Sequence, residues 1–338
     1  MTTPIRVIQI GFGSVGRGFA EIVQRKREFL AQRQGVQIAF AGVATRSWCC
    51  YDPAGIDLVA LGRAVELGNT DSLPARQPWS PHELIAQAEA DVLVEVSPTD
   101  LDSGEPATSH IRAAFARGMH VVTANKGPLA LHGPALLAEA RERGLGFGYE
   151  GTVMAGTPAL RLGWGALAGC ELREVRGIVN GTTNYMLTHM ESGMAYAEAL
   201  AEAQRLGYAE TDPTGDVEGY DAAAKAAILA TMLMGGDIRP EQVERTGITQ
   251  LTPDDIAAAA AAGERWKLIA RVTRAPDGAI RASVQPMRVP VTHPLASVSG
   301  ATNALTYTTD LLGDVTLIGP GAGGVATGFA LLADILAL

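Results

Sequence analysis

The sequence predicts an α/β protein in which a doubly wound parallel sheet at the N-terminus is followed by a second, α+β domain. Three observations predict this fold class. Short apolar segments alternate with helical patterns over roughly the first 137 residues. A glycine-rich turn separates the first apolar segment from the first helical one. After residue 137 the regular alternation stops, and longer helical and strand-like segments follow.

The first domain is built from predicted strands and the helices between them. Its strands are expected at 5–10, 36–44, 91–97 and 119–124, and its helices at 15–31, 58–67 and 111–117. Because helices follow the strands, neighbouring strands run in the same direction and the helices cover the sheet. This order predicts a sheet that binds its ligand at the carboxyl ends of its strands.

The second domain is expected to hold a mixed or antiparallel sheet with helices on one side. Its strands are predicted at 173–179, 267–273 and 279–287, and its helices at 217–234 and 255–262. A glycine loop at 319–324 leads into a final apolar helix at 326–336, which is expected to pack back on the first domain. We therefore predict one domain from residues 1–137 and 311–338, and a second from residues 138–310.

The composition argues against several kinds of partner. The net charge of -9 argues against nucleic acid, because proteins that bind its phosphate backbone need a clustered basic surface. No apolar stretch of about 18 residues and no signal peptide is present, so no membrane partner is expected. Cys49, Cys50 and Cys170 do not form the framework of a secreted disulfide protein. A cytoplasmic protein with a small-molecule substrate is predicted.

Residues 11–16, Gly-Phe-Gly-Ser-Val-Gly, follow the first predicted strand and open a helix. In such a turn Gly11 permits the tight bend, Gly13 lets the backbone approach a pyrophosphate, and Gly16 lets the helix lie close to the strand. The turn therefore predicts a Rossmann-like, dinucleotide-binding domain. The predicted contacts to the cofactor are Gly11, Phe12, Gly13, Ser14, Val15 and Gly16.

The end of the second predicted strand bears on the choice of cofactor. An NAD-preferring site usually has Asp or Glu there, about 20 residues after the turn, to bond the ribose hydroxyls. This strand ends in Thr45-Arg46-Ser47 and has no carboxylate. Arg46 with Ser47 could hold a 2′-phosphate by a charge-assisted bidentate contact, unless Arg46 is only a solvated loop residue. We expect NADP(H) to be preferred and leave NAD(H) open as the alternative.

Ionisable side chains gather in residues 203–225, where five carboxylates lie within a dozen positions. On a helix that starts near Val217, Asp221 and Lys225 are four residues apart and face the same way. A surface ion pair would explain them, but beyond Asp221 this helix is almost entirely Ala, Ile, Leu and Met. A lysine on such an apolar helix indicates a functional role.

This segment resembles the signature of the homoserine dehydrogenases at Ala203, Gly207, Asp212-Pro213, Asp216, Gly219, Asp221 and Lys225. The resemblance extends to the glycine turn and to residues 123–127, 150–158, 180–184 and 319–323, so it spans nearly the whole chain. It implies an enzyme that interconverts L-aspartate 4-semialdehyde and L-homoserine. Many members carry a C-terminal regulatory extension, and we expect this chain to be a short, catalysis-only form.

The resemblance also implies which residues form the active site. Glu210 and Asp221 would hold the α-ammonium group of the substrate, and Asp216 would orient Lys225. Further implied contacts are those of Gly181 and Thr182 with the substrate, and those of Ser97, Thr99, Lys126 and Gly321 with the cofactor. A monovalent cation such as sodium is implied near Glu150 and the carbonyls of Val153, Ala155 and Thr157. A homodimer through the sheet of the second domain is implied as well.

The chemistry of aldehyde reduction requires a proton donor, because hydride transfer leaves an alkoxide. A positioned general acid contributes about 10²–10⁴-fold to such a step. Lys225 is the first candidate, and Lys126, at the carboxyl end of a predicted parallel strand, is the second. A free lysine has a pKa of about 10.4, which a second ammonium group nearby and partial burial would lower. We expect the two lysines to activate each other.

Two other functions are weighed against this one. Aspartate-semialdehyde dehydrogenase acts on the same aldehyde through a thioester and needs an activated cysteine. Cys49, Cys50 and Cys170 do not lie in a sequence context typical of such a nucleophile. A non-catalytic, dinucleotide-sensing regulator would add a basic DNA-binding helix pair, which no segment supplies.

Overall fold

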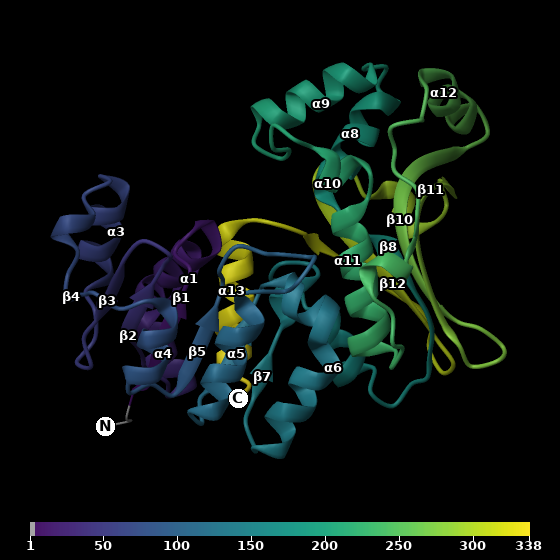
Figure 1. Ribbon diagram of the computed structural model, residues 1–338. Coiled ribbons are helices and arrows are strands. Elements are labelled where there is room, and N and C mark those ends of the chain that lie inside the picture. The colour runs from purple at the N-terminus through teal and green to yellow at the C-terminus, as the bar shows by residue number, and fades with distance from the viewer. Residues whose placement is uncertain (1–3) are drawn as a thin grey trace. The chain divides into compact units, whose positions relative to one another are not determined.

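The computed structural model describes residues 4–338, which form two compact units (Figure 1). Unit 1 comprises the chain up to Gly156 together with Gly323–Leu338, and unit 2 comprises Thr157–Ala322. Residue 137, where the sequence analysis ends the first domain, lies inside a helix of unit 1, and residue 310 lies between two paired strands of unit 2. No helix in the described part of the chain is long and apolar enough to cross a membrane.

Unit 1 is an α/β unit with a sheet in the order β4-β3-β2-β1-β5-β6-β7. Its strands are β1 (Ile5–Ile10), β2 (Ile38–Ala44), β3 (Cys49–Tyr51), β4 (Arg76–Gln77), β5 (Val92–Glu95), β6 (His120–Thr123) and β7 (Phe147–Gly148). Its helices are α1 (Ser14–Arg25), α2 (Arg27–Phe29), α3 (Leu58–Glu66), α4 (Pro81–Gln87), α5 (Ala107–Ala116), α6 (Lys126–Glu142) and α13 (Gly324–Ile335). At one edge β3 pairs antiparallel with both β2 and β4, and the other pairings are parallel. The doubly wound parallel sheet is thus confirmed.

Neighbouring side chains of a strand point to opposite faces of the sheet. Here the side chains on both faces are apolar, and helices cover both. On one face Val7 packs in a cluster that includes Phe19 of α1 and Leu331 of α13. On the other face Ile8 packs with side chains of α4, α5 and α6, among them Ile111. Figure 1 shows the C-terminal helix α13 beside α1. A Cβ atom on Gly18 would lie 2.3 Å from the carbonyl oxygen of Gly324, so only glycine permits this close approach.

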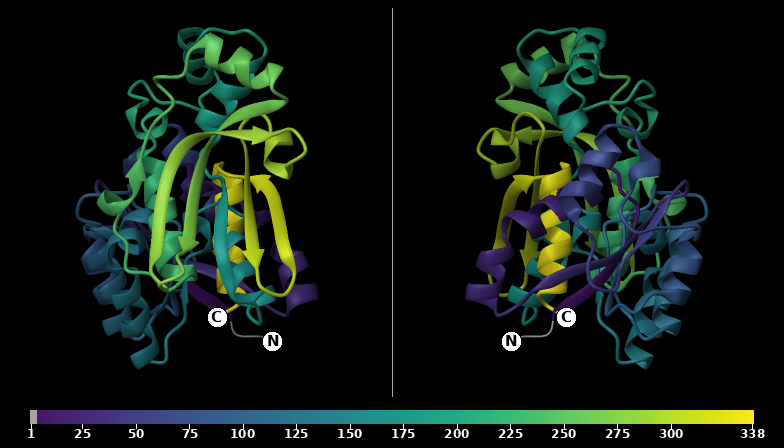
Figure 2. Two further views of the ribbon diagram at one scale, coloured as in Figure 1. Left: turned by 90° about the vertical axis from the view of Figure 1, so that its right-hand side faces the viewer. Right: turned by 90° about the vertical axis from the view of Figure 1, so that its left-hand side faces the viewer.

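Unit 2 holds a second sheet in the order β13-β12-β8-β10-β11-β9, which is antiparallel except for the short pair β9–β11. Its strands are β8 (Leu172–Ile178), β9 (Glu244–Arg245), β10 (Glu264–Arg274), β11 (Ile280–Pro290), β12 (Thr302–Thr309) and β13 (Gly313–Pro320). Its helices are α7 (Ala159–Arg161), α8 (Gly181–Glu191), α9 (Tyr196–Arg205), α10 (Thr214–Val217), α11 (Tyr220–Ile228) and α12 (Pro253–Ala261). Figure 2 shows the long strands β10 to β13 of this sheet face-on.

Two features of unit 2 differ from the sequence prediction. The helix expected to start near Val217 begins at Tyr220, because Gly219 has a φ of 81° and separates it from the short helix α10. The β12–β13 hairpin was not predicted. Strand β12 lies between β8 and β13 and is buried on both faces, so its sequence lacks the alternation that marks a half-buried strand.

Candidate active site

The glycine turn of unit 1 connects β1 with α1. Gly11 has a φ of 100°, and a Cβ atom there would lie 2.2 Å from the carbonyl oxygen of Val96. A Cβ atom on Gly16 would lie 2.5 Å from the carbonyl oxygen of Gly11, so the helix begins against the strand end. Gly13 differs, because it has an ordinary φ of −77° and a Cβ atom on it would meet nothing within 4 Å. The chain itself requires glycine at positions 11 and 16 but leaves the space at Gly13 open.

The other predicted residues of this turn lie at the start of α1. Ser14 and Val15 are its first residues, and its N-cap, Gly13, offers no side-chain hydrogen bond to the first N–H groups. Phe12 is buried, and its ring meets that of Trp48 edge to face at 5.8 Å. An uncapped helix N-terminus beside an open glycine suits a pyrophosphate, which accepts hydrogen bonds from backbone N–H groups.

This contrast predicts different outcomes for two alanine substitutions. Gly13→Ala should leave the melting temperature unchanged and weaken NAD(P)H binding on the order of 10-fold, because its methyl group would occupy only space that a pyrophosphate needs. Gly11→Ala should lower the free energy of unfolding by about 1–3 kcal/mol, because it forces a left-handed residue against Val96. Calorimetry and cofactor fluorescence measure both effects, and undiminished binding by Gly13→Ala would remove this glycine from the cofactor site.

Arg46 lies in the turn between β2 and β3 and is exposed. The hydroxyl of Thr45 shapes this turn, since it accepts hydrogen bonds from the backbone N–H groups of Ser47 and Trp48, both at 3.2 Å. Among residues 4–338 no hydrogen bond or ion pair engages the Arg46 guanidinium. The group is therefore available for a ligand at the end of β2.

The loops after β5 and β6 bring together the remaining predicted residues of unit 1. Ser97 follows β5, and its carbonyl oxygen accepts a hydrogen bond of 3.1 Å from the side-chain amide of Asn125. The same Asn125 caps α6 by accepting from the Gly127 N–H at 3.2 Å. Lys126 is half-buried as the first residue of α6, and Thr99 is exposed. Both loops thus lie at the carboxyl ends of parallel strands, where open sheets bind ligands.

A buried ion pair is the centre of the site in unit 2. Lys225 is 8% exposed. Its ammonium group donates hydrogen bonds of 2.7 Å to Asp221 Oδ2 and to the carbonyl oxygen of Val179. Both partners of the pair lie on α11, four residues apart, as the sequence predicts. A buried charge is stable only when it is paired and hydrogen-bonded, and this lysine meets both conditions.

Asn180 links this pair to a second carboxylate. Its side-chain amide donates to Asp216 Oδ1 at 2.6 Å and to Asp221 Oδ2 at 3.1 Å. Burial raises the pKa of Asp216, and the negative charge of Asp221 adds to this, while hydrogen bonds from Asn180 and Thr182 oppose it. Sequence reasoning missed Asn180 and Asn125 as site residues. Both precede a helix directly after a strand and cap that helix, which is the signal that could have found them.

The three other substrate residues expected in unit 2 have different environments. Thr182 is buried, and its hydroxyl donates to the carbonyl oxygen of Tyr208 at 2.7 Å. Gly181 begins α8, and a Cβ atom there would lie 2.7 Å from the carbonyl oxygen of Ala301. The Glu210 carboxylate is exposed and is not joined to the Lys225–Asp221 pair by any hydrogen bond within the described residues. Hydrogen bonds therefore connect Asp216, Asp221 and Lys225 in one network, of which Glu210 is not a member among the described residues.

The residues implied for a cation lie in the loop after β7. Glu150 is 1% exposed, and its backbone N–H donates to Asp334 Oδ2 at 2.9 Å. Ala155 has a φ of 48°, a left-handed conformation that is strained for a residue other than glycine. Val153 and Ala155 belong to unit 1, whereas Thr157 is the first residue of unit 2. Carboxylate and carbonyl oxygens are ligands that suit a hard cation, so these donors fit the implied group.

Gly321, expected to contact the cofactor, follows β13 in unit 2. A Cβ atom on it would lie 2.0 Å from the side-chain amide of Asn303, so any larger residue there would have to displace Asn303. The Asn303 side chain is fully buried, and neither its oxygen nor its nitrogen has a hydrogen-bond partner within residues 4–338. The Gly321 backbone next to the unsatisfied Asn303 amide is compatible with a polar ligand.

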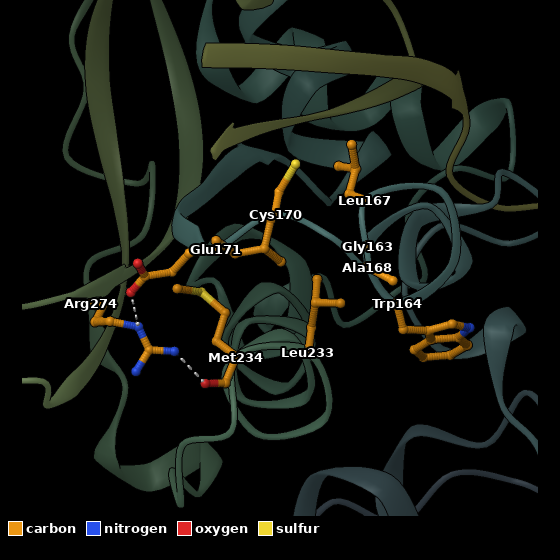
Figure 3. Close-up of a pocket in the computed structure, with 10 residues that line it drawn as sticks. Gly163, Trp164, Leu167, Ala168, Cys170, Glu171, Leu233, Met234 and Arg274 are labelled. Atoms are coloured by element: carbon orange, nitrogen blue, oxygen red, sulfur yellow. Dashed lines mark hydrogen bonds and ion pairs between the residues drawn. The ribbon is translucent and has the colours of Figure 1, made fainter. Parts of the chain in front are cut away.

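Cys49 and Cys50 do not have the properties of a nucleophile. Burial raises the pKa of Cys49 to about 12 and that of Cys50 to about 11, whereas a catalytic thiol needs a lowered pKa. Both lie fully buried in β3. Cys170 lines a cavity of about 330 Å³ in unit 2, shown in Figure 3. There Arg274 is held by the Met234 carbonyl oxygen at 3.0 Å, and none of the predicted site residues lines the cavity.

Comparisons with family models place both units in one family. A model described as homoserine dehydrogenase matches residues 158–336. A model described as the NAD binding domain of homoserine dehydrogenase matches residues 11–150. The two matches together cover most of both units and agree with the family resemblance found in the sequence.

Individual relatives agree with these models along the whole chain. The NAD(+)-dependent homoserine dehydrogenase of Pseudomonas canavaninivorans is 44% identical over 99% of this chain and 96% of its own. A solved homoserine dehydrogenase from Thiobacillus denitrificans is 35% identical, with a TM-score of 0.86 over 99% of this chain and 73% of that one. A hyperthermophilic archaeal homoserine dehydrogenase in complex with NADPH is 30% identical, with a TM-score of 0.84 over 99% and 97%.

Proposed function

This chain belongs to the homoserine dehydrogenase family, and from this premise we propose that it interconverts L-aspartate 4-semialdehyde and L-homoserine with a nicotinamide cofactor. The observation that carries the proposal is the buried pair of Lys225 and Asp221, which supports Lys225 as the proton donor. The fully buried cysteines Cys49 and Cys50 argue against a thioester mechanism. A regulator without catalysis would have no use for a buried ammonium group held by two acceptors.

The cofactor supplies a hydride to the aldehyde carbon when it is bound. In this direction Lys225 protonates the oxygen that becomes the hydroxyl of homoserine, and in the reverse direction it accepts that proton. Asp221 and the Val179 carbonyl oxygen hold the ammonium group in place for this proton transfer. Lys126, the first residue of α6 in unit 1, is the second candidate for this proton transfer. Such a positioned acid accounts for about 10²–10⁴ of the rate.

We assign the substrate's own charges to the remaining residues of unit 2. Asp221 and Glu210 bind the α-ammonium group, and Asp216 supports Asp221 through their shared partner Asn180. Thr182 and the backbone of Gly181 contact the substrate from the start of α8. The backbone N–H groups of Gly181 and Thr182 belong to the N-terminus of α8, which favours the negatively charged carboxylate of an amino acid.

A single assay tests this function. Purified protein is mixed with L-homoserine and NADP⁺ or NAD⁺, and the absorbance of the reduced nicotinamide is followed. We expect reduction of at least one cofactor, and no reduction with L-homoserine replaced by L-serine, whose chain is one carbon shorter. Folded protein that reduces neither cofactor over a broad range of pH and salt would refute the proposal.

We propose that NADP(H) is the preferred cofactor and that Arg46 binds its 2′-phosphate. The exposed guanidinium in the β2–β3 turn supports this, whereas the NAD(+)-dependent relative favours NAD(H) as the second candidate. Arg46→Ala should weaken NADPH binding by about 1.5–3 kcal/mol and leave NADH nearly unchanged, because only NADPH has the phosphate. Parallel titrations measure both. Equal effects on the two cofactors would assign Arg46 to the solvated loop.

Two further features belong to the same proposal. A monovalent cation such as sodium would be held by Glu150 and the carbonyls of Val153, Ala155 and Thr157, where it would fix this loop. The protein would form a homodimer through the sheet of unit 2, whose edge strand β13 exposes Ile318 to 50%. Light scattering after gel filtration tests the dimer, and activity in sodium against a tetraalkylammonium salt tests the cation.

A further inference from the structure

A buried carboxylate ends strand β5 and is not used by the proposed chemistry. Glu95 is fully buried, and its Oε1 atom accepts hydrogen bonds from the hydroxyl of Ser97 and from the Ser97 N–H at 3.2 Å. Its Oε2 atom is buried and has no hydrogen-bond partner within residues 4–338. A buried polar group is costly unless it is hydrogen-bonded, so the contacts of Oε1 are the ones that hold this side chain.

His110 of α5 supplies the remaining contact. Its Nδ1 atom lies 3.4 Å from Glu95 Oε1, and the residue is 2% exposed. On its outer side the His110 ring packs against the ring of His82 on α4, with centroids 4.7 Å apart. Burial, and then the neighbouring His110, lower the pKa of His82, so this outer ring stays neutral more readily. Carboxylate and imidazole therefore form one pair between β5 and the helices that cover it.

This pair is connected to both loops that were assigned to the cofactor. Ser97, held by Glu95, accepts the hydrogen bond of Asn125, and Asn125 caps the helix that begins with Lys126. A second link runs from the Thr123 hydroxyl to the Glu95 carbonyl oxygen at 2.8 Å, and the same hydroxyl accepts from the Asn125 N–H at 2.9 Å. Glu95 thus links the ends of β5 and β6 twice, with its side chain through Ser97 and with its backbone through Thr123.

We propose that Glu95 and His110 are positioning residues for the nicotinamide half of the cofactor. They hold the Ser97–Thr99 turn, and through Asn125 the first turn of α6, in the geometry that the nicotinamide meets. The inference rests on the proposed function and deepens it, since it names residues that touch neither substrate nor cofactor. If the pair served stability alone, its loss would not distinguish one end of the dinucleotide from the other.

The test compares His110→Leu with His110→Asn, because the asparagine amide can still donate from the position of Nδ1 whereas leucine cannot. Each variant is titrated by calorimetry with NADPH and with its adenine half, 2′,5′-ADP, and in parallel with NADH and ADP. We expect His110→Leu to weaken binding of the whole dinucleotides roughly 10-fold and to leave the adenine halves unchanged. His110→Asn should bind all four ligands as the wild type does.

Equal weakening of whole and half ligands, or no weakening of either, would overturn the inference. Should His110→Leu fail to fold, Glu95→Gln removes the carboxylate that holds Ser97 and should show the same selective loss, and the absence of that loss would overturn the inference as well. Wild-type protein that binds no dinucleotide would instead refute the proposed function and, with it, this role. The wild-type titration in the same series therefore separates the two failures.

Discussion

Lys225→Ala should lower kcat by roughly 10²–10⁴ while the affinity for NADPH stays close to that of the wild type. The expectation follows from the geometry of the ammonium group, which is buried and held by Asp221 and the Val179 carbonyl oxygen. A general acid acts mainly in the transition state, so its loss should appear in kcat rather than in binding. Steady-state kinetics with L-homoserine measure the first quantity and cofactor fluorescence the second.

Lys225→Arg is the matched control for this experiment. Arginine keeps the positive charge beside Asp221 but does not release its proton in proteins, so it separates the ion pair from proton transfer. We expect the arginine variant to fold and to remain nearly as slow as the alanine variant. Primary amines added to Lys225→Ala should restore part of the rate. Folded Lys225→Ala that keeps turnover within about threefold of wild type would make Lys126 the better candidate.

Asp221→Asn should reduce kcat/KM for L-homoserine roughly 10²-fold, which corresponds to a loss of about 3 kcal/mol in transition-state stabilisation. The substitution keeps the shape of the side chain but removes the charge that faces the Lys225 ammonium group at 2.7 Å. It also removes a charge proposed for the substrate's α-ammonium group. Because the pair is largely but not completely buried, we expect the free energy of unfolding to fall by about 2 kcal/mol as well.

Asp212→Asn serves as the control within the same acidic segment. Asp212 is exposed, and its carboxylate accepts a hydrogen bond from the Thr214 N–H at 3.0 Å, outside the network of Asn180. An exposed carboxylate of this kind contributes only a few tenths of a kcal/mol. Kinetics and thermal unfolding of both variants should therefore differ clearly. A loss in Asp212→Asn as large as that in Asp221→Asn would show that the segment acts through its total charge.

Much of unit 1 was predictable because its signals are local. The strand, the glycine turn and the helix of residues 5–25 follow from apolar periodicity and from three glycines, two of which the backbone requires. The pairing of Asp221 with Lys225 was equally predictable, since residues four positions apart on a helix lie on the same face. The family resemblance added roles that spacing alone does not define, such as those of Gly181 and Gly321.

The tertiary structure decided what depends on contacts between distant segments. Glu95 and His110 are 15 residues apart on different elements, and only the packing of α5 on the sheet makes their side chains a pair. Asn180 meets Asp216 and Asp221 across 36 and 41 residues, and the β12–β13 hairpin joins a sheet whose strand order no local pattern encodes. The sequence by itself determined the local elements, the cofactor turn and the family of this protein. The fold determined which buried polar side chains satisfy one another, because an unpaired polar group costs free energy wherever the chain buries it.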